Sequence, residues 1–285
     1  MLAQPTAFTG STRSGATALA GRLCFFDNLR VVAMALVIMQ HVGQVYGPTE
    51  GVWMIPRQAE TAFILDPFFT VNRSFGMSLF FMIAGYFAVL SCDKKGPEPF
   101  LKDRALRLGL PLLGWAVFMA LMQMFLTPTP ATGYVLGIPW PIEVAHMWFV
   151  QHLLIFCAVY AVARMALPAR PLPDKASRVP PGWAIVLFTL GLAFASAVVR
   201  IWFDMDEWVY LLGVIKLQPF DLPRDLTLFV VGMLAARRDW VMRFPTKSGR
   251  LWLGVGLALA AGWYALRLAL PAGVEADERL VGGRH

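Results

Sequence analysis

The chain of 285 residues is 58% hydrophobic and only 15% charged, with a mean hydropathy of +0.59. Soluble domains carry about 25% charged residues, so this composition excludes a chain built mainly of soluble domains. Its net charge of +7 is compatible with nucleic-acid binding, but on so apolar a chain basic residues usually mark loops that face anionic lipid. We therefore expect an integral membrane protein whose surroundings are the lipid bilayer, with no nucleic-acid partner.

Residues 1–21 lack the compact apolar region and cleavage site of a secretory signal peptide. We interpret them as a disordered cytoplasmic leader, followed by a transmembrane domain over residues 22–271 and a polar tail over 272–285. Arg13 and Arg22 favour a cytoplasmic N-terminus in a multi-pass protein of the inner (plasma) membrane. The three cysteines form no metal-binding pattern, and we expect no metal site.

Apolar runs near the roughly 20 residues that cross a bilayer as a helix recur along the chain. Six are predicted to be spans, and polar residues interrupt the first half of a further run at 220–236. Counting this run as a seventh span places the loops around Lys94, Lys175 and Lys247 inside and the chain's end outside, as the positive-inside rule requires. The sequence thus predicts an all-α, polytopic transmembrane bundle of about seven spans, with a short interfacial helix at 208–217. The six clearer runs are 29–46, 75–91, 106–126, 147–167, 183–203 and 251–270.

The first predicted span carries a polar stripe. At about 100° per residue, Asp27, Arg30, His41 and Gln44 fall on one helical face, and His41 lies roughly 16 Å along the axis from Arg30. An ionisable residue deep in a membrane is by default a functional-site hypothesis. His41 is suited to act as a general base or to carry an acyl group as an acyl-imidazole. The structural alternative for His41 is a neutral histidine that is hydrogen-bonded to a neighbouring helix. The alternative for Asp27 and Arg30 is that they cap the helix and snorkel at the membrane interface.

Arg104 and Arg107 are spaced i and i+3 at the entry to the third span, on the predicted cytoplasmic side. Two guanidinium groups there are suited to the phosphates of coenzyme A, because arginine binds such groups bidentately. The alternative is a pair of charges that only sets the topology. Near the predicted outer surface, Glu143, His146 and Trp148 gather where a sugar is able to bind, although an interfacial aromatic is the more common role of such a tryptophan.

Three blocks resemble the membrane-bound acyltransferase 3 family, closest to its glucan biosynthesis protein C branch. They cover roughly residues 22–160 in the family's order and spacing. The first is RLCFFDNLR at 22–30, leading to His41. The second runs from LFFMIAGYF at 79–87 to FLKDRALRLGLP at 100–111, and the third is HMWF at 146–149 with Leu153 and Leu154.

The resemblance implies that His41 is the catalytic histidine, that Arg104 and Arg107 are associated with acyl-CoA, and that the acceptor is a carbohydrate. It implies transfer of an acetyl- or succinyl-class acyl group from a cytoplasmic acyl-CoA, with no permanently bound cofactor, to a hydroxyl of a periplasmic or cell-surface glycan. Asp27, Arg30, Glu143, His146 and Trp148 complete the expected substrate-binding residues. The alternative function is a carrier or flippase for an anionic or sugar-linked substrate, since a polar stripe can also line a transport path.

The sequence departs from the family pattern in two ways. Ala84 stands where the family's second-helix motif usually has serine before glycine, so a hydroxyl is missing there. Family members also usually have about ten spans, whereas this sequence supports seven. We therefore expect a bundle that is shorter at its C-terminal end than is usual for the family.

Overall fold

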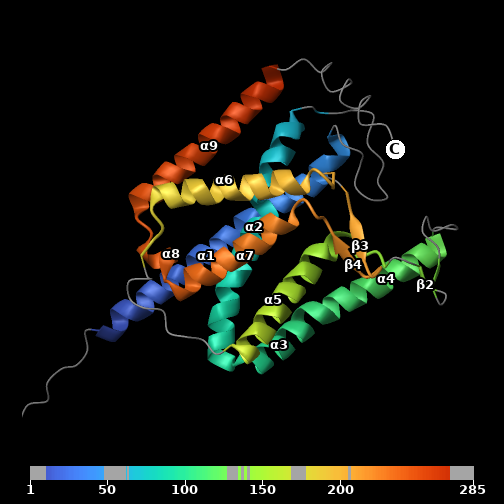
Figure 1. Cartoon of the computed structure of the whole chain (residues 1–285), viewed down its shortest axis with the longest axis horizontal. Helices are drawn as coiled ribbons and strands as arrows, with labels where there is room; N and C mark the ends of the chain where they lie inside the picture. Colours follow the sequence, from blue (N-terminus) through green and yellow to red (C-terminus); the bar gives the residue numbers. More distant parts are fainter. Residues whose placement is uncertain are drawn as a thin grey trace, which may run out of the picture. The chain divides into compact units, whose positions relative to one another are not determined.

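The computed structural model describes residues 11–47, 62, 64–126, 134–135, 138–139, 142–167, 178–204 and 207–269, which are almost wholly helical (Figure 1). They belong to two compact units, one of residues 1–76 with 244–285 and one of residues 77–243, and each is described by itself. The elements, in chain order, are α1 (Ser11–Gly43), η1 (Gln44–Tyr46), α2 (Leu65–Lys95), α3 (Pro97–Arg104), the π-helical η2 (Ala105–Gly109), α4 (Leu110–Leu126), β1 (Tyr134–Val135), β2 (Ile138–Pro139), η3 (Ala145–Met147), α5 (Trp148–Ala166), α6 (Gly182–Val199), β3 (Val209–Leu211), β4 (Ile215–Leu217), α7 (Leu222–Arg237), α8 (Trp240–Arg243) and α9 (Thr246–Ala269).

Five helical segments are long and apolar enough to cross a membrane by length and composition, among the residues that the structure describes. They are Cys24–Tyr46, Leu65–Lys95, Pro97–Phe125, Ala145–Ala166 and Gly182–Val199. The predicted all-α membrane bundle is thereby confirmed. The other two predicted spans coincide with α7 and α9, and α7 has 16 residues, about 24 Å of helix, less than the hydrocarbon thickness of about 30 Å. A total of seven spans stays a prediction.

Helix α1 begins at Ser11, ahead of the apolar run that starts near Leu29, and so includes part of the segment predicted to be a leader. Residues 11–24 contain no proline and several Ala and Leu residues, which allow the helix to extend ahead of its apolar run. Residues 1–10 of that leader, and the polar tail predicted over 272–285, lie outside the described residues.

In the first unit, a buried asparagine ties α1 to the first half of α2. Asn72 is 3% exposed, and its amide donates to the backbone carbonyl of Leu36 at 3.2 Å and to Oε1 of Gln40. Polar side chains that bond across helices help to hold membrane bundles together. The Phe69 ring packs on Gly43 near the end of α1. This end of α1 carries His41.

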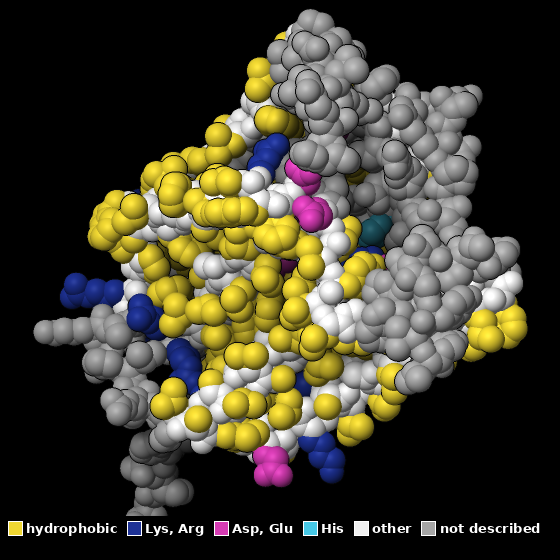
Figure 2. Space-filling model, turned by 45° about the vertical axis from the view of Figure 1, so that its right-hand side comes forward, with side chains coloured by type: hydrophobic (Ala, Val, Ile, Leu, Met, Phe, Trp, Pro, Cys, Tyr) yellow, Lys and Arg dark blue, Asp and Glu magenta, His cyan; other side chains and the backbone are white. Residues whose placement is uncertain are grey.

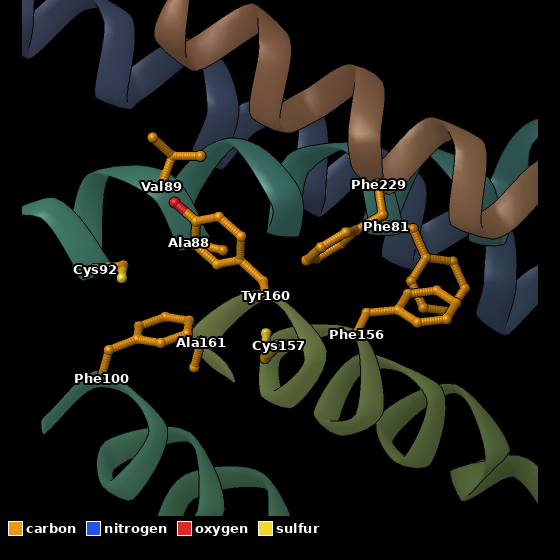
Figure 3. Close-up of a cluster of buried hydrophobic side chains, with 10 residues drawn as sticks. All are labelled: Phe81, Ala88, Val89, Cys92, Phe100, Phe156, Cys157, Tyr160, Ala161 and Phe229. Carbon is orange, nitrogen blue, oxygen red and sulfur yellow. The ribbon is translucent and has the colours of Figure 1, made fainter. Parts of the chain in front are cut away.

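In the second unit, a buried cluster that we call the α5 core joins α5 to α2, α3 and α7 (Figure 3). Aromatic rings dominate it: the centroids of Phe81 and Phe156 lie 5.2 Å apart, and those of Phe156 and Phe229 lie 5.5 Å apart. Ala84, the departure from the family's serine, packs against this cluster as an apolar side chain. The α5 core consists of Phe81, Ala88, Val89, Cys92, Phe100, Phe156, Cys157, Tyr160, Ala161 and Phe229.

Two glycines allow α2 and α7 to touch backbone to backbone. A Cβ atom on Gly85 would lie 2.1 Å from the carbonyl oxygen of Phe229, and one on Gly232 would lie 1.9 Å from that of Met82. Small residues at such crossings are typical of membrane helices, because close approach maximises van der Waals contact. These glycines set the separation of α2 and α7 within the unit.

The chain reverses between α2 and α3 at Gly96, whose φ of 86° is readily adopted only by glycine. From Pro97 the helix continues through η2 into α4, and α5 returns beside α3 (Figure 1). Exposed apolar side chains such as Leu113, Leu121 and Leu190 cover α4 and α6. Apolar side chains likewise dominate the described part of the face in Figure 2, as expected of a surface that lipid covers.

The interfacial helix predicted at 208–217 is wrong, because this segment is an antiparallel β-hairpin. Strands β3 and β4 pair Val209 with Leu217 and Leu211 with Ile215. Leu212 and Gly213 have positive φ angles of 55° and 68°, which turn the chain sharply, while the β-branched and aromatic residues beside them favour strands.

Replacing Gly85 or Gly232 with alanine should separate α2 from α7 and lower the stability of the second unit. Overpacking typically costs about 1–3 kcal/mol, and here the obstacle is rigid backbone. The measurement is the thermal midpoint of the detergent-solubilised variants. Gly114→Ala in α4 is the matched control, since its Cβ would meet nothing within 4 Å. Equal midpoints for Gly85→Ala and Gly114→Ala would contradict the close crossing.

Candidate functional site

His41 lies in the last turn of α1 and has an exposed side chain. Within the segment Cys24–Tyr46 it is five residues from the end, or about 7.5 Å at 1.5 Å per residue. The sequence placed it near mid-membrane, whereas this earlier start of the span places it closer to the far interface. Its imidazole has no hydrogen-bond partner among the described residues.

Asp27 and Arg30 are ion-paired with each other on α1. Nη1 of Arg30 lies 3.1 Å from Oδ1 of Asp27, and both side chains are substantially exposed. Since α1 begins at Ser11, Asp27 lies within the helix and does not cap it. The pair occupies the face predicted for the polar stripe, and its exposure leaves it accessible to an anionic ligand.

Arg104 and Arg107 have different surroundings, although both lie at the junction of α3 and η2. The Arg104 guanidinium lies over the Phe100 ring at 5.3 Å, and its Nε is buried without a hydrogen-bond partner among the described residues. Arg107 is 70% exposed, and its Nε donates to Oδ1 of Asp103 at 2.8 Å. A π-helical turn rotates successive residues less than an α-helical turn does, so the two arginines diverge more than their spacing predicts. Such π-helical turns are frequent at functional sites.

Glu143 is the centre of what we call the hairpin network, in which the β3–β4 hairpin is bound to the start of α5. Its Oε1 accepts from Nζ of Lys216 at 2.6 Å and from the backbone N–H of Ala145, and its Oε2 accepts from the Tyr210 hydroxyl. Because these protein groups use both carboxylate oxygens, Glu143 is better placed to position the hairpin than to bind a substrate directly.

The charge on Glu143 is stabilised by this network. Burial acts to raise the pKa of its carboxyl, but the hydrogen bonds from Lys216 and Tyr210, the charge of Lys216 and the Ala145 N–H together hold that pKa below its usual value. Burial and the Glu143 carboxylate raise the pKa of Tyr210 well above its ordinary value. At neutral pH the site therefore holds an ionised Glu143 carboxylate and a neutral Tyr210 phenol.

Two buried side chains of α5 complete the hairpin network. Gln151 donates to the Val214 carbonyl at 2.7 Å and accepts from the Lys216 N–H at 2.9 Å. Nε2 of His152 lies 3.0 Å from the Lys216 carbonyl, which can only accept, so this nitrogen carries the proton. These bonds fix the backbone of β4 to α5.

Aromatic side chains surround this network. The Trp148 ring contacts Trp208 at 5.7 Å and His152 at 5.4 Å, and the Lys216 ammonium lies 4.7 Å from the centre of the Trp208 ring. His146 is exposed and packs against Trp115 of α4 at 4.5 Å. The structure thus brings Glu143 and Trp148 into one aromatic and charged site with the hairpin, while His146 faces α4.

Sequence reasoning missed the contribution of the hairpin residues Trp208, Tyr210 and Lys216. Alternation of Val, Tyr, Leu and Ile around Gly213 was the available signal for strands. The expectation of a helix concealed that Tyr210 and Lys216 approach a carboxylate more than 60 residues earlier. Among the described residues, no group of three or more His, Cys, Asp or Glu side chains is placed to hold a metal ion.

A second buried polar cluster lies between α2 and α7. Ser78 donates to Oδ1 of Asp225 at 2.6 Å and accepts from Nε of Arg224 at 2.6 Å, and Arg224 also pairs with Asp221 at 3.0 Å. Asp225 is 1% exposed, which closes it to a substrate in this conformation. The polar start of α7, which in the sequence only interrupts an apolar run, is therefore part of the packing.

Comparison with known proteins supplies a family match. The family model described as an acyltransferase domain, acyltransferase 3, matches residues 25–279. This range contains His41, Arg104, Arg107 and the whole hairpin network. No solved structure matches the chain.

Curated relatives named glucans biosynthesis protein C are also similar to this chain. The protein from Salmonella gallinarum (strain 287/91 / NCTC 13346) is 27% identical over 259 residues, and that from Salmonella paratyphi B (strain ATCC BAA-1250 / SPB7) is 26% identical over 259 residues. Each alignment covers 85% of this chain and 66% of the relative. The chain thus spans just under two thirds of the length of these relatives.

The Glu143 network should make the protein sensitive to acid. An unfolded glutamate titrates near about pH 4.3, and the folded pKa of Glu143 is lower. Its stabilisation is therefore complete above about pH 4.3 and is lost as the pH falls through the folded value. Glu143→Gln should lower the free energy of unfolding by about 1–3 kcal/mol at pH 7 and reduce its loss in acid.

The check is the thermal midpoint of wild type and Glu143→Gln between pH 7 and pH 3. Glu98→Gln, at an exposed position of α3, is the matched control and should behave as wild type. A double variant, Glu143→Gln with Lys216→Met, should be less unstable than the two single changes predict, because neither charge is left without its partner. Strictly additive losses of stability would argue against an interaction between Glu143 and Lys216.

Proposed function

The chain belongs to the acyltransferase 3 family, and from this membership we propose that it is a membrane O-acyltransferase that moves an acyl group from acyl-CoA to a glycan hydroxyl. The observation that carries the proposal is the family match over residues 25–279, which includes an accessible histidine on an apolar helix. The name of the relatives, glucans biosynthesis protein C, supports a glucan-like acceptor. The acyl group is of the acetyl or succinyl class.

His41 has the chemistry that the transfer needs. A hydroxyl oxygen of the acceptor attacks the thioester carbonyl carbon, a carbon–oxygen bond forms, and the carbon–sulfur bond breaks. Acting as a general base, His41 takes the hydroxyl proton and returns it to the departing thiolate, so that the histidine is regenerated. In the alternative mechanism, His41 attacks the thioester and holds the acyl group until the hydroxyl displaces it. Both mechanisms require an imidazole that a substrate is able to reach.

Acyl-CoA is proposed to bind from the cytoplasmic side through Arg104 and Arg107. Support comes from the arginines themselves, since Arg104 has no acidic partner among the described residues and is held by a ring and not by a carboxylate. The guanidinium fork of Arg104 is therefore free to bind a phosphate oxygen. The N-terminus is proposed to lie on the same, cytoplasmic side of the inner membrane, following the distribution of basic residues.

The glycan is proposed to bind at the hairpin network. Trp148 and Trp208 offer ring surface to a sugar, and Lys216 and Tyr210 offer polar groups beside it. Partly buried aromatic rings next to a few fixed polar groups are typical of small-ligand sites. In this proposal Glu143 positions Lys216 and Tyr210, and His146 lies at the edge of the site.

Replacing His41 with glutamine should abolish acyl transfer. Glutamine preserves a polar side chain of similar reach but cannot exchange the proton, and loss of a general base costs about 100- to 10,000-fold in rate. The measurement is transfer of radiolabelled acyl groups from acyl-CoA to glucan by purified protein. His41→Ala should be equally inactive. The variant His41→Gln should bind coenzyme A as wild type does. This binding is the control for correct insertion of the variant into the membrane. Near-normal transfer by this variant would refute the assignment.

Changing Arg104 or Arg107 to alanine should weaken the affinity for acyl-CoA by about ten- to hundredfold, because each substitution removes a charge-assisted contact worth about 1.5–3 kcal/mol. Lysine should restore only part of the affinity, since it returns the charge without the fork. The dissociation constant of coenzyme A is the quantity to measure. Lys102→Ala is the matched control, because Lys102 is an exposed cation on the same helix. If the double alanine variant binds normally, these arginines only set the topology.

A further inference from the structure

Two arginines from different helices meet on one tyrosine at the end of the second unit where α2 turns into α3. Nη1 of Arg164, in the last turn of α5, donates to the Tyr160 hydroxyl oxygen at 3.1 Å and to Oδ1 of Asp93 at 2.6 Å. Nη2 of Arg237, in the last turn of α7, donates to the same hydroxyl oxygen at 3.3 Å. We call these four residues the arginine–tyrosine network.

The network carries more positive than negative charge. Asp93 neutralises Arg164, but Arg237 has no carboxylate within ion-pair distance among the described residues. Two like charges that share one oxygen repel each other, and Arg164 is only 17% exposed, so water screens this repulsion incompletely. A bound anion would relieve it.

The ordinary structural explanation covers only part of this arrangement. Cations in the last turn of a helix are favoured by the helix dipole, and arginines near a membrane surface snorkel toward water. These effects explain why α5 and α7 each end with an arginine. They do not explain why both guanidinium groups turn to one phenol, since snorkelling side chains would spread apart.

We infer that Tyr160, Arg164 and Arg237 form a binding site for a phosphate-bearing anion. Arginine forks bind phosphate oxygens bidentately, and here the phenol holds two forks together before the ligand arrives. Tyr160 is itself fixed in the α5 core, where its ring packs against Phe100 at 6.2 Å (Figure 3). Phe100 links this site to Arg104, because the Arg104 guanidinium lies over the same Phe100 ring that contacts Tyr160.

The same phosphate chemistry has two sources, the phosphates of coenzyme A and the headgroup of an anionic lipid. Naming coenzyme A as the natural ligand rests on the proposed function, whereas the anion site itself does not. Coenzyme A carries a diphosphate and a separate ribose phosphate, so a second arginine site beside Arg104 matches a ligand with two anionic positions.

The test uses the full chain in phosphatidylcholine nanodiscs, with inorganic pyrophosphate and coenzyme A as separate probes. Arg237→Gln should weaken the binding of both by about ten- to hundredfold, as expected for loss of a charge-assisted contact. Tyr160→Phe should weaken binding less, by about two- to tenfold, because both arginines remain but lose their shared anchor. Arg243→Gln is the matched control, an exposed arginine six residues beyond Arg237, and should bind as wild type.

A parallel arm measures how much phosphatidylglycerol remains bound to each purified variant. If Arg237→Gln and Tyr160→Phe keep their affinity for both soluble probes but retain less phosphatidylglycerol than Arg243→Gln, the site holds a lipid headgroup. If neither soluble probe nor lipid binding changes in folded variants, the inference is overturned and the network is only a tie between helices. Tyr160→Phe preserves the ring of the α5 core, so it tests the anion site even where Arg237→Gln fails to fold.

The two proposals fail in different ways. Wild-type protein that binds pyrophosphate through Arg237 but transfers no acyl group would remove the proposed function and leave the anion site. Active protein whose acyl transfer and anion binding do not depend on Arg237 or Tyr160 would remove the anion site and leave the proposed function.

Discussion

The close crossing of α2 and α7 is the contact on which the second unit depends. Because Gly85 and Gly232 have no side chains, the backbones touch, and the residues on either side are drawn into contact. Toward the start of α7 this places Arg224 and Asp225 against Ser78, and in the middle it places Phe229 against Phe156. At the end of α7 the same approach allows Arg237 to reach Tyr160 on α5. A wider crossing would weaken the contacts at the start, middle and end of α7 together.

Helix α5 separates the two polar sites of this unit by about the thickness of a bilayer. It has 19 residues, or about 28 Å of helix. Trp148 begins the helix beside the hairpin network, and Arg164 in its last turn belongs to the arginine–tyrosine network. Polar groups near the ends of a span cost less than the same groups at its middle, because water and headgroups reach them. The helix thus presents different chemistry to the two surfaces while its middle stays apolar.

The sequence predicted the membrane class and most helices, because apolar runs of about 20 residues have few other structural meanings. It failed at the segment 208–217, where a hairpin of short strands gives a weak signal and its partner Glu143 is distant in sequence. It placed Arg104 and Arg107 on one face, since a spacing of three assumes an α-helix, and the π-helical turn was not foreseeable from composition. The shared contact of Arg164 and Arg237 was also not foreseeable, because only the fold brings the ends of α5 and α7 to one tyrosine.

The composition of the α5 core limits how the proposed reaction proceeds. Phe81, Phe156 and Phe229 fill the space between the two polar ends, and each is buried to at least nine tenths. A sugar drawn into this layer would lose its hydrogen bonds to water and find no polar partners in exchange. An acetyl group has a much smaller polar surface than a glycan does, and unlike a succinyl group it carries no charge. In the proposed reaction, the acyl group therefore moves toward the acceptor, and the sugar remains at the hairpin side.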